Sequence, residues 1–209
     1  MEGKTNLWYE LKISVENAVR SDFDTDNFLE KTKFSDKPAG IWKFQDEEMY
    51  SILNQEWIYY LKQCNIPVTS FMMFYRQPNY QHPEAHIDVH RPAKPTDVPL
   101  LSVFGLNLVI SKNDDSYMSW YDVSDFEKSK EMSKTLADTP YLSWPMSEVQ
   151  NKEIDRVIIG NRIVLVNVGV PHNVIMNNNE RWLISLRCRN SAGLKNWDEA
   201  INYFSKYIK

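Results

Sequence analysis

A short segment of the chain, "HPEAHIDVHRP" at residues 82–92, contains three of the four histidines and an aspartate. If residues 85–90 form a strand, the side chains of His86, Asp88 and His90 point to one face, because side chains alternate along a strand. Imidazole and carboxylate groups bind transition metals, and two of them on one face can hold an ion from one side. Such triplets often arise by chance, and a solvated surface strand is the more common origin of them, so the segment indicates a metal site only if a distant residue joins it.

The fourth histidine, His172, is the candidate for that distant residue. It follows an almost wholly apolar run, "RIVLVNVGVP", and therefore emerges from the predicted core, where an imidazole needs a polar partner or a metal. Two imidazoles and one carboxylate, from His86, Asp88 and His172, form the ligand set of non-haem Fe(II) sites and leave other positions on the metal open. His90 could replace His86, because a DxH pair has the same spacing, and His82 is predicted to lie in a loop.

The segment "RWLISLRC" at residues 181–188 predicts a strand with two unlike faces. Trp182, Ile184, Leu186 and Cys188 share one face, and Arg181, Leu183, Ser185 and Arg187 share the other. The first face is wholly apolar and must pack on a core, so the two arginines point into the other side of a buried sheet. Buried guanidinium groups require anions. The sequence therefore predicts an anion site on this strand.

A four-residue turn at residues 177–180 would join this strand to His172 as a hairpin. Ser185 would then lie opposite His172, with Arg181 four residues farther along, which is ~13 Å at ~3.3 Å per residue. That distance is about the span of a five-carbon dicarboxylate on the metal plus an extended arginine. The planar guanidinium group suits the terminal carboxylate of such an acid.

In their order and spacing, the HxD pair, the histidine after an apolar strand and the arginine nine positions beyond it resemble the Fe(II)/2-oxoglutarate-dependent dioxygenases. The stretch "PHNVIMNNNERWLISL" is similar to the aspartyl/asparaginyl and prolyl hydroxylase branches, and the likeness covers roughly residues 71–189. The resemblance implies a double-stranded β-helix, iron ligated by His86, Asp88 and His172, and Arg181 bound to the distal carboxylate of 2-oxoglutarate. Because the aspartyl hydroxylase branch can lack the carboxylate ligand that Asp88 supplies, the substrate of that branch is not carried over.

The resemblance also implies a reaction. O2 and 2-oxoglutarate are consumed, succinate and CO2 are released, and an unidentified substrate is hydroxylated, or demethylated by hydroxylation. A small molecule, a free amino acid and a peptide side chain all stay open as substrates, and the two arginines favour an anionic one. Two alternatives stay open as well: a cupin-like metalloenzyme that does not use 2-oxoglutarate, and a noncatalytic jelly-roll binding module.

Further residues are assigned to the predicted cavity. Within the resemblance, Tyr75, on the strand before the HxD pair, is expected to donate a hydrogen bond to the distal carboxylate. Asn107 lies on the less apolar face of "LLSVFGLNLVI" and either lines the cavity or bonds to neighbouring backbone. Arg187 is expected to bind an acidic substrate or the metal-proximal carboxylate, or else to pair with an internal acid. Trp120 and Ser185 are assigned to the substrate pocket, although an aromatic residue on a strand is more often part of the core.

The elements that must position these residues are mostly strands. Short β-rich runs separated by turn residues predict a mainly β fold with flanking helices, in which residues 67–190 form a double-stranded β-helix of the jelly-roll or cupin-like kind. Residues 127–155, which are charged and irregular, are predicted to be an insertion or lid over one end of the sheet. Residues 1–66 are predicted to support the core with a strand and a helix, and residues 195–209 with a second helix.

Local signals place these supporting elements. At residues 46–64, Asp46 is positioned to cap a helix whose apolar residues recur on one stripe. Near the C-terminus, Asn196 and Glu199 have the spacing of a capping box. Near the N-terminus, "LKISV" at residues 11–15 alternates apolar and polar residues, which predicts a half-buried strand.

Composition and charge limit the possible classes of protein. With 209 residues, 43% apolar and 25% charged, the chain fits one globular domain. The net charge of −4 and the lack of a long Lys/Arg run disfavour a nucleic-acid partner. Cys64 and Cys188 match neither a disulfide framework nor a zinc pattern. The N-terminus lacks the apolar core of a signal peptide, and no run approaches the ~20 apolar residues of a membrane span, so we expect a soluble, cytoplasmic protein.

Overall fold

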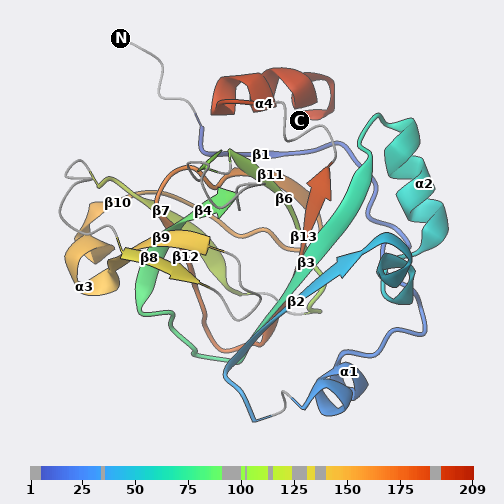
Figure 1. Cartoon of the computed structure of the whole chain (residues 1–209), viewed down its shortest axis with the longest axis horizontal. Coiled ribbons are helices and arrows are strands. Elements are labelled where there is room, and N and C mark those ends of the chain that lie inside the picture. The colour runs from blue at the N-terminus through green and yellow to red at the C-terminus, as the bar shows by residue number, and fades with distance from the viewer. Residues whose placement is uncertain are drawn as a thin grey trace.

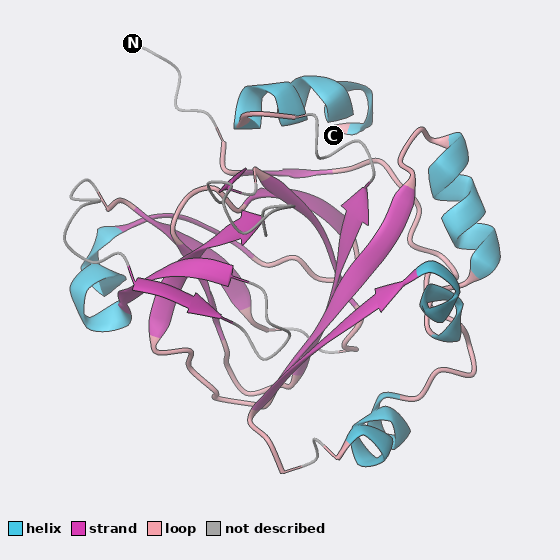
Figure 2. Cartoon of the chain, in the orientation of Figure 1, coloured by secondary structure: helices cyan, strands magenta, loops and turns pink. Residues whose placement is uncertain are grey.

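The computed structural model of the chain describes residues 6–33, 36–90, 100–101, 103–112, 115–123, 131–134, 140–188 and 194–209. For residues 89, 90, 100, 101, 131–134 and 140 it describes the backbone alone. In this part of the chain the fold is mainly β, with two antiparallel sheets in the centre and helices around them (Figure 1 and Figure 2). The mainly β class with flanking helices is as predicted.

One sheet has six strands among the described residues, in the order β1-β11-β6-β13-β3-β2. The bounds of these strands are β1 (Trp8–Glu10), β2 (Ala39–Gln45), β3 (Val68–Arg76), β6 (Phe104–Val109), β11 (Ile163–Asn167) and β13 (Arg181–Cys188). The strand with two arginines, β13, lies inside this sheet between β6 and β3. Both of its edges are therefore paired.

The second sheet has the order β10-β7-β12-β4-β9-β8, and β5 pairs with β4 beside this path. The bounds of its strands are β4 (Glu84–His90), β5 (Leu100–Leu101), β7 (Tyr117–Tyr121), β8 (Glu131–Lys134), β9 (Pro140–Pro145), β10 (Glu153–Val157) and β12 (His172–Ile175). The HxD pair lies on β4, which has β12 on one side and β9 on the other.

Helices flank the sheets (Figure 1). Their bounds are α1 (Thr25–Thr32), η1 (Asp46–Ser51), α2 (Gln55–Gln63), α3 (Met146–Val149), η2 (Gln150–Lys152), α4 (Trp197–Phe204) and η4 (Ser205–Tyr207). One hydrophobic cluster joins Leu29 of α1, Leu61 of α2 and Phe204 of α4 to Trp182 and Ile184 of β13. The apolar face predicted for β13 is therefore confirmed, and it lies under these helices. No helix in the described ranges is long and apolar enough to cross a membrane.

The other face of the six-stranded sheet looks toward the second sheet. A second hydrophobic cluster contains Val164, Val166, Leu183, Met118 and Trp120, which come from both sheets. On the far side of the second sheet, Val149 of α3 packs in a third cluster with Trp144 and Ile87. The molecule is thus layered, and the space between the two sheets holds the candidate site.

The helix predicted to start at Asp46 is divided in two. The 3-10 helix η1 comes first, with Asp46 at a left-handed φ of 50°, and α2 begins only after Asn54. The side chain of Asn54 caps α2 by accepting a 2.9 Å hydrogen bond from the backbone N–H two residues on. Leu53 is fully buried and forms an isolated β-bridge with Val19, which draws the chain out of helical geometry between the two pieces.

Residues 127–155 are not an irregular insertion where the structure describes them. The strands β8 and β9, the helix α3 and the start of β10 lie in this range, and β9 pairs with β4, with Tyr141 opposite Asp88. Residues 124–130 and 135–139 lie outside the described residues. The charged composition of the segment concealed the strands, which extend the sheet beside the HxD pair.

The strand predicted at residues 11–15 is displaced. β1 ends at Glu10, and beyond it Leu11 forms an isolated bridge with Ile208 and donates a 3.0 Å backbone hydrogen bond to Ile163. Leu11 and Ile13 are nevertheless buried. The alternation of apolar residues here reports burial on the core without regular strand pairing.

The C-terminal helix begins where it was predicted and ends earlier. The Asn196 side chain accepts a 2.9 Å hydrogen bond from the backbone N–H of Glu199 and caps α4. Ala200 and Phe204 are buried against the six-stranded sheet, as expected for a buttress. The last turn is the 3-10 helix η4 rather than α-helix.

Candidate metal centre

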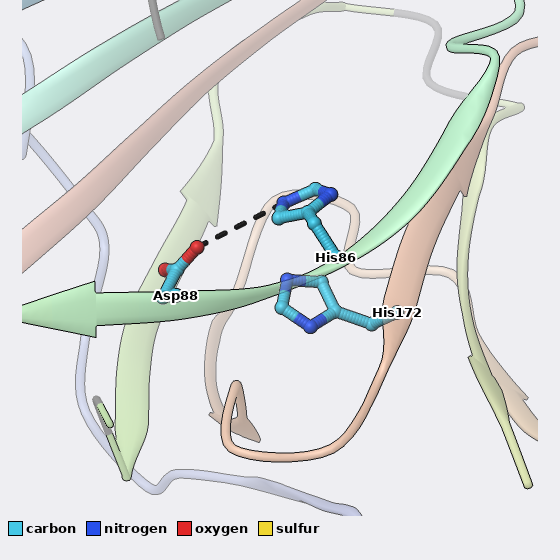
Figure 3. A group of neighbouring side chains, drawn as sticks. All are labelled: His86, Asp88 and His172. Carbon is cyan, nitrogen blue, oxygen red and sulfur yellow. Dashed lines mark ion pairs between the residues drawn. The ribbon is translucent and has the colours of Figure 1, made fainter. Parts of the chain in front are cut away.

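The candidate ligands come from two neighbouring strands of the second sheet. β4 and β12 run antiparallel, and His172, the first residue of β12, lies directly opposite His86. Directly opposite residues of neighbouring strands point to the same face. Asp88, two residues after His86, shares that face. Figure 3 shows His86 and Asp88 on one strand and His172 on the next.

These side chains converge. One ligand atom from each of His86, Asp88 and His172 lies within 4.8 Å of the others. His86 Nε2 is 3.8 Å from Asp88 Oδ1, and the ring centroids of His86 and His172 are 4.5 Å apart. A separation of 3.8 Å is longer than a hydrogen bond, so the imidazole and the carboxylate face one another but do not form a hydrogen bond with each other. His90 lies on the same strand, and its side chain is outside the described part.

The two imidazoles are in the form that a metal requires. His172 Nδ1 lies 2.9 Å from the carbonyl oxygen of Val170, and because a carbonyl only accepts, Nδ1 carries the hydrogen and Nε2 keeps its lone pair. Burial lowers the pKa of His172, and burial together with the charge of the neighbouring histidine lowers the pKa of His86 well below its usual value. His86 Nδ1 is buried with no hydrogen-bond partner among the described residues. Neutral rings beside a carboxylate fit a divalent metal ion.

Asp88 is held between the histidines and an arginine. Its Oδ1 faces His86, and its Oδ2 lies 3.7 Å from Arg187 Nη2. The same Nη2 lies 3.6 Å from the sulfur of Met72. Of the alternatives for Arg187, pairing with an internal acid is the one that the structure contains. Because the two carboxylate oxygens of Asp88 face different groups, one of them can bind a metal while the other stays with Arg187.

These residues open onto a cavity of about 270 Å³ between the sheets. The residues assigned to the site from the sequence that lie on its wall are His86, Asp88, His172, Tyr75, Asn107, Arg181, Ser185 and Arg187. Hydrocarbon from Leu183, Phe74 and Val174 lines much of the rest. The face of β13 from Arg181 to Arg187 thus looks into the cavity, on the side away from the helices.

Residues 177–180 do not form the predicted hairpin turn within one sheet. β12 belongs to the second sheet and β13 to the first, so the chain crosses from one sheet to the other. Asp115 holds this crossing, because its carboxylate accepts hydrogen bonds of 3.0 and 3.2 Å from the backbone N–H groups of Asn178 and Asn179. A contact with a residue so distant in the sequence could not be read from the turn itself.

The crossing changes the neighbours of Ser185. Instead of lying opposite His172, Ser185 pairs with Asn107 on β6 and faces the histidines across the cavity. Asn107 is 6% exposed, and its Oδ1 has no hydrogen-bond partner among the described residues. The pair therefore presents polar groups to the cavity from the sheet opposite to the candidate ligands.

The cavity wall also contains an arginine that was not predicted from the sequence. Arg76, the last residue of β3, lies directly opposite Arg181, the first residue of β13. Arg181 is 3% exposed, and Arg76 Nη1 donates a 2.9 Å hydrogen bond to the carbonyl oxygen of Val174. Burial, and then the charge of Arg181, lowers the pKa of Arg76 to about 10. Period-two alternation with Met72 and Phe74 is a signal that could have placed Arg76 on this face.

Tyr75 borders the cavity, but its ring does not point to the histidines. The ring centroid lies 4.7 Å from that of Trp182, in the hydrophobic cluster under the helices. Tyr75 is directly opposite Trp182 and shares its face, whereas Arg181 points to the other face, so this orientation is not the one expected for a hydrogen bond to a carboxylate held by Arg181. Arg76, the next residue, points to the face of Arg181.

Trp120, which was assigned to the substrate pocket, is a core residue. It is fully buried, and it is not among the described residues that line the cavity. Its Nε1 donates a 2.7 Å hydrogen bond to the carbonyl oxygen of Asn167, and it lies directly opposite His172 in the sheet. Trp120 therefore supports the imidazole from the side and does not contact the cavity.

Two further side chains complete the wall around His86. His82 lies in a loop, as predicted, and its ring centroid is 5.9 Å from that of His86. Its Nδ1 is 3.0 Å from the carbonyl oxygen of Glu84, and burial lowers its pKa. The ring centroid of Tyr141 on β9 is 5.6 Å from that of His86. The hydroxyl of Tyr141 donates a 3.2 Å hydrogen bond to the Glu84 carboxylate. The charged composition of residues 127–155 gave no signal for β9, the strand that carries Tyr141.

The arrangement can bind a metal ion from one side and an anion at another point of the same cavity. Open metal positions facing a partly apolar cavity suit a small ligand that reaches both. Comparison with known protein families finds no family model that matches the chain, and comparison with curated proteins finds no match. The residues of the site are therefore the basis for assigning a function.

Proposed function

We propose that the chain is a non-haem Fe(II)- and 2-oxoglutarate-dependent oxygenase that hydroxylates a small or peptide substrate and releases succinate and CO2. One observation carries the proposal: ligand atoms of His86, Asp88 and His172 lie within 4.8 Å of one another on the wall of a cavity that also contains Arg181. Two facing antiparallel sheets are compatible with the double-stranded β-helix of these oxygenases. The resemblance in order and spacing of the same residues supports the same assignment.

The donor set suits a catalytic metal ion with open positions. Two imidazoles and one carboxylate are the facial ligand set of non-haem Fe(II) oxygenases and also occur in catalytic zinc sites, whereas structural zinc sites take four protein ligands. When bound, iron supplies the O2 chemistry that amino-acid side chains lack. Because β4 and β12 are neighbours in one sheet, the three ligands approach from one side, and Arg187 keeps one oxygen of Asp88 turned away from them.

The cavity suits a short dicarboxylic acid. Under this proposal, Arg181 receives the distal carboxylate in a bidentate contact, and hydrocarbon from Leu183 and Phe74 excludes water from the chain of the acid. A volume of about 270 Å³ is at or below the low end for ligand pockets, so the substrate is a small molecule or an inserted side chain. Ser185 and those N–H donors of Arg187 that do not face Asp88 are the groups proposed to contact it, which favours an anionic or amino-acid-like substrate.

The first test measures binding before turnover. Mn(II), in place of Fe(II), should raise the melting temperature of the wild type, and 2-oxoglutarate should then add about 2.7 kcal/mol of stability at one hundred times its Kd. Asp88→Ala should lose both effects, whereas Arg181→Gln should lose only the second. Arg156→Gln is the matched control, because Arg156 is exposed on β10 and pairs with Glu153.

The second test measures turnover. With Fe(II), ascorbate and candidate substrates, the wild type should release succinate, and an Asp88→Ala, His172→Ala double variant should not. Metal binding without any effect of 2-oxoglutarate would favour a cupin-like metalloenzyme. No stoichiometric binding of Fe(II), Mn(II) or Ni(II) by calorimetry would favour a noncatalytic binding module. Full turnover by the double variant would reject the assignment.

A further inference from the structure

Two arginines lie beside one another on the cavity wall. Arg76 and Arg181 are directly opposite on β3 and β13, so their side chains leave the sheet on the same face, with Cβ atoms about 5 Å apart. Like charges in such a pair repel one another, and the repulsion grows where water is excluded. Both residues line the cavity. Arg181 is buried and Arg76 is half-buried, and a cation pair shielded from water in this way is stabilised by an anion that contacts both members.

The charge of Arg76 is not balanced by a carboxylate in the described part of the chain. Burial and the charge of Arg181 lower its pKa, and Tyr80 is the group that raises it. Its hydrogen bond from Nη1 to the carbonyl oxygen of Val174 uses one of the five N–H donors of a guanidinium group. Donors therefore remain for a ligand in the cavity.

Arg76 also lies close to the candidate metal ligands. Val174, which accepts its hydrogen bond, is two residues after His172 on β12 and shares its face. Arg76 thus reaches from the first sheet to the strand that carries His172. Arg76 therefore lies between the strand that carries His172 and its neighbour Arg181 on β13.

We propose that Arg76 binds the ligand directly, and that Arg76 and Arg181 together hold one carboxylate and make the site selective for a dicarboxylic acid over a monocarboxylic acid of the same length. The identity of that acid as 2-oxoglutarate rests on the proposed function, but the carboxylate site itself needs no metal. A carboxylate has two oxygens with about four lone-pair sites, enough for two planar guanidinium groups. It also removes the repulsion between the two cations. Loss of Arg76 should therefore weaken binding even though Arg181 remains.

The deciding experiment uses the metal-free full chain and glutarate, a five-carbon dicarboxylate without a 2-oxo group. Glutarate should raise the melting temperature of the wild type, and pentanoate, with a single carboxylate, should not. Arg76→Gln should weaken glutarate binding roughly 10- to 100-fold. Arg76→Lys, which keeps the charge without the planar fork, should fall between the two. Arg156→Gln, at an exposed position, should behave as the wild type does.

A second experiment uses the Mn(II)-loaded protein with 2-oxoglutarate and 2-oxopentanoate, which share the metal-binding 2-oxo acid group and differ in the distal carboxylate. Arg76→Gln should weaken 2-oxoglutarate binding roughly 10- to 100-fold and leave 2-oxopentanoate binding unchanged. Mn(II) affinity should not fall. If Arg76 only connects the two sheets and does not contact the ligand, the variant will instead lose stability, and its affinity for both acids will fall by the same factor. That result overturns the proposal.

Other outcomes separate this proposal from the proposed function. Equal glutarate binding by the wild type and Arg76→Gln overturns it, as does stabilisation by sulfate as large as that by glutarate, because the site would then accept any anion. Glutarate binding that depends on Arg76, combined with no effect of 2-oxoglutarate on the Mn(II)-loaded protein, would support the carboxylate site and reject the oxygenase.

Discussion

The two faces of the six-stranded sheet differ in how completely they are filled. Toward the helices, Trp182 and Ile184 of β13 are 1% and 0% exposed and pack in a continuous hydrophobic cluster. Toward the second sheet, Arg181 and Ser185 of the same strand line a cavity of about 270 Å³. Consecutive residues of one strand thus belong to a close-packed core and to a hollow, polar site.

The two faces therefore have different roles, since the helix side supplies stability and the cavity side contains the candidate site. The helices close over one face because their apolar stripes can follow it, and close packing there supplies most of the hydrophobic stabilisation. On the other face, the two sheets pack together through the second hydrophobic cluster, but around the candidate site the arginines and histidines keep them apart, because such groups need polar partners or a ligand. Substitutions on the two faces should therefore have different consequences.

The largest expected effect is on the helix side. Trp182→Ala should lower the free energy of unfolding by about 3–5 kcal/mol, because it opens a large void in the cluster around Tyr75 and Trp42. Denaturant unfolding measures the change, and the folded variant should bind Mn(II) as the wild type does. Leu183→Ala, at the next position but on the cavity side, should cost less, since the void that it leaves joins an existing cavity. Equal costs would contradict the distinction between the faces.

The next effect should appear on the cavity side, in metal binding. His172→Ala should weaken Mn(II) binding more than the roughly 100-fold that is typical for loss of a residue behind a metal ligand. Its effect on the stability of the metal-free protein should be smaller than that of Trp182→Ala. Calorimetry gives the affinity, and His82→Ala is the control, because His82 lines the cavity outside the group of candidate ligands. A comparable loss in the control would mean that the ligands are misassigned.

A smaller effect is expected for the arginine behind Asp88. Arg187→Gln should weaken Mn(II) binding about 10-fold, because Arg187 lies 3.7 Å from Oδ2 of Asp88 and helps to orient the carboxylate. Stability should change little, since the side chain of Arg187 is 24% exposed. An affinity equal to that of the wild type would show that this ion pair does not act on the metal site.

The smallest expected effect is a pH dependence confined to the cavity side. Burial holds the pKa values of His82, His86 and His172 below the usual 6.5 in the folded state. As the pH falls through 6.5, the unfolded chain binds more protons than the folded chain, so the free energy of unfolding of the metal-free protein decreases. Above about pH 7.5, the contribution of these histidines to the free energy of unfolding is constant. Urea unfolding of the wild type and His172→Asn at several pH values measures it. The variant should lose less stability on acidification, and parallel curves would contradict the account.

Alternation along single strands was the part of this structure that could be predicted from the sequence. Residues 181–188 have side chains with two clear classes of chemistry, so the apolar face was placed correctly on the core. The convergence of His86, Asp88 and His172 followed from a similar local argument, joined to the order of the segments and to a resemblance. Strand period is set by backbone geometry and needs no knowledge of distant residues.

Features that depend on distant contacts could not be predicted in this way. Whether the chain turns back or crosses between sheets after β12 depends on Asp115, which binds the backbone of the crossing. Arg76 ends an apolar strand, where a charged residue is easily taken for a boundary, and its importance comes from pairing with Arg181. Tyr141 approaches His86 only because β9 pairs with β4. Such pairings are properties of the whole sheet.

The central claim is that three side chains from two neighbouring strands bind one metal ion. A crystal structure of the protein grown with Mn(II), with anomalous diffraction recorded at the manganese edge, tests it most directly. The account predicts one anomalous peak within bonding distance of an imidazole nitrogen of His86, an oxygen of Asp88 and Nε2 of His172. A structure with no peak between these residues, or with Mn(II) bound elsewhere while the cavity holds none, would contradict it.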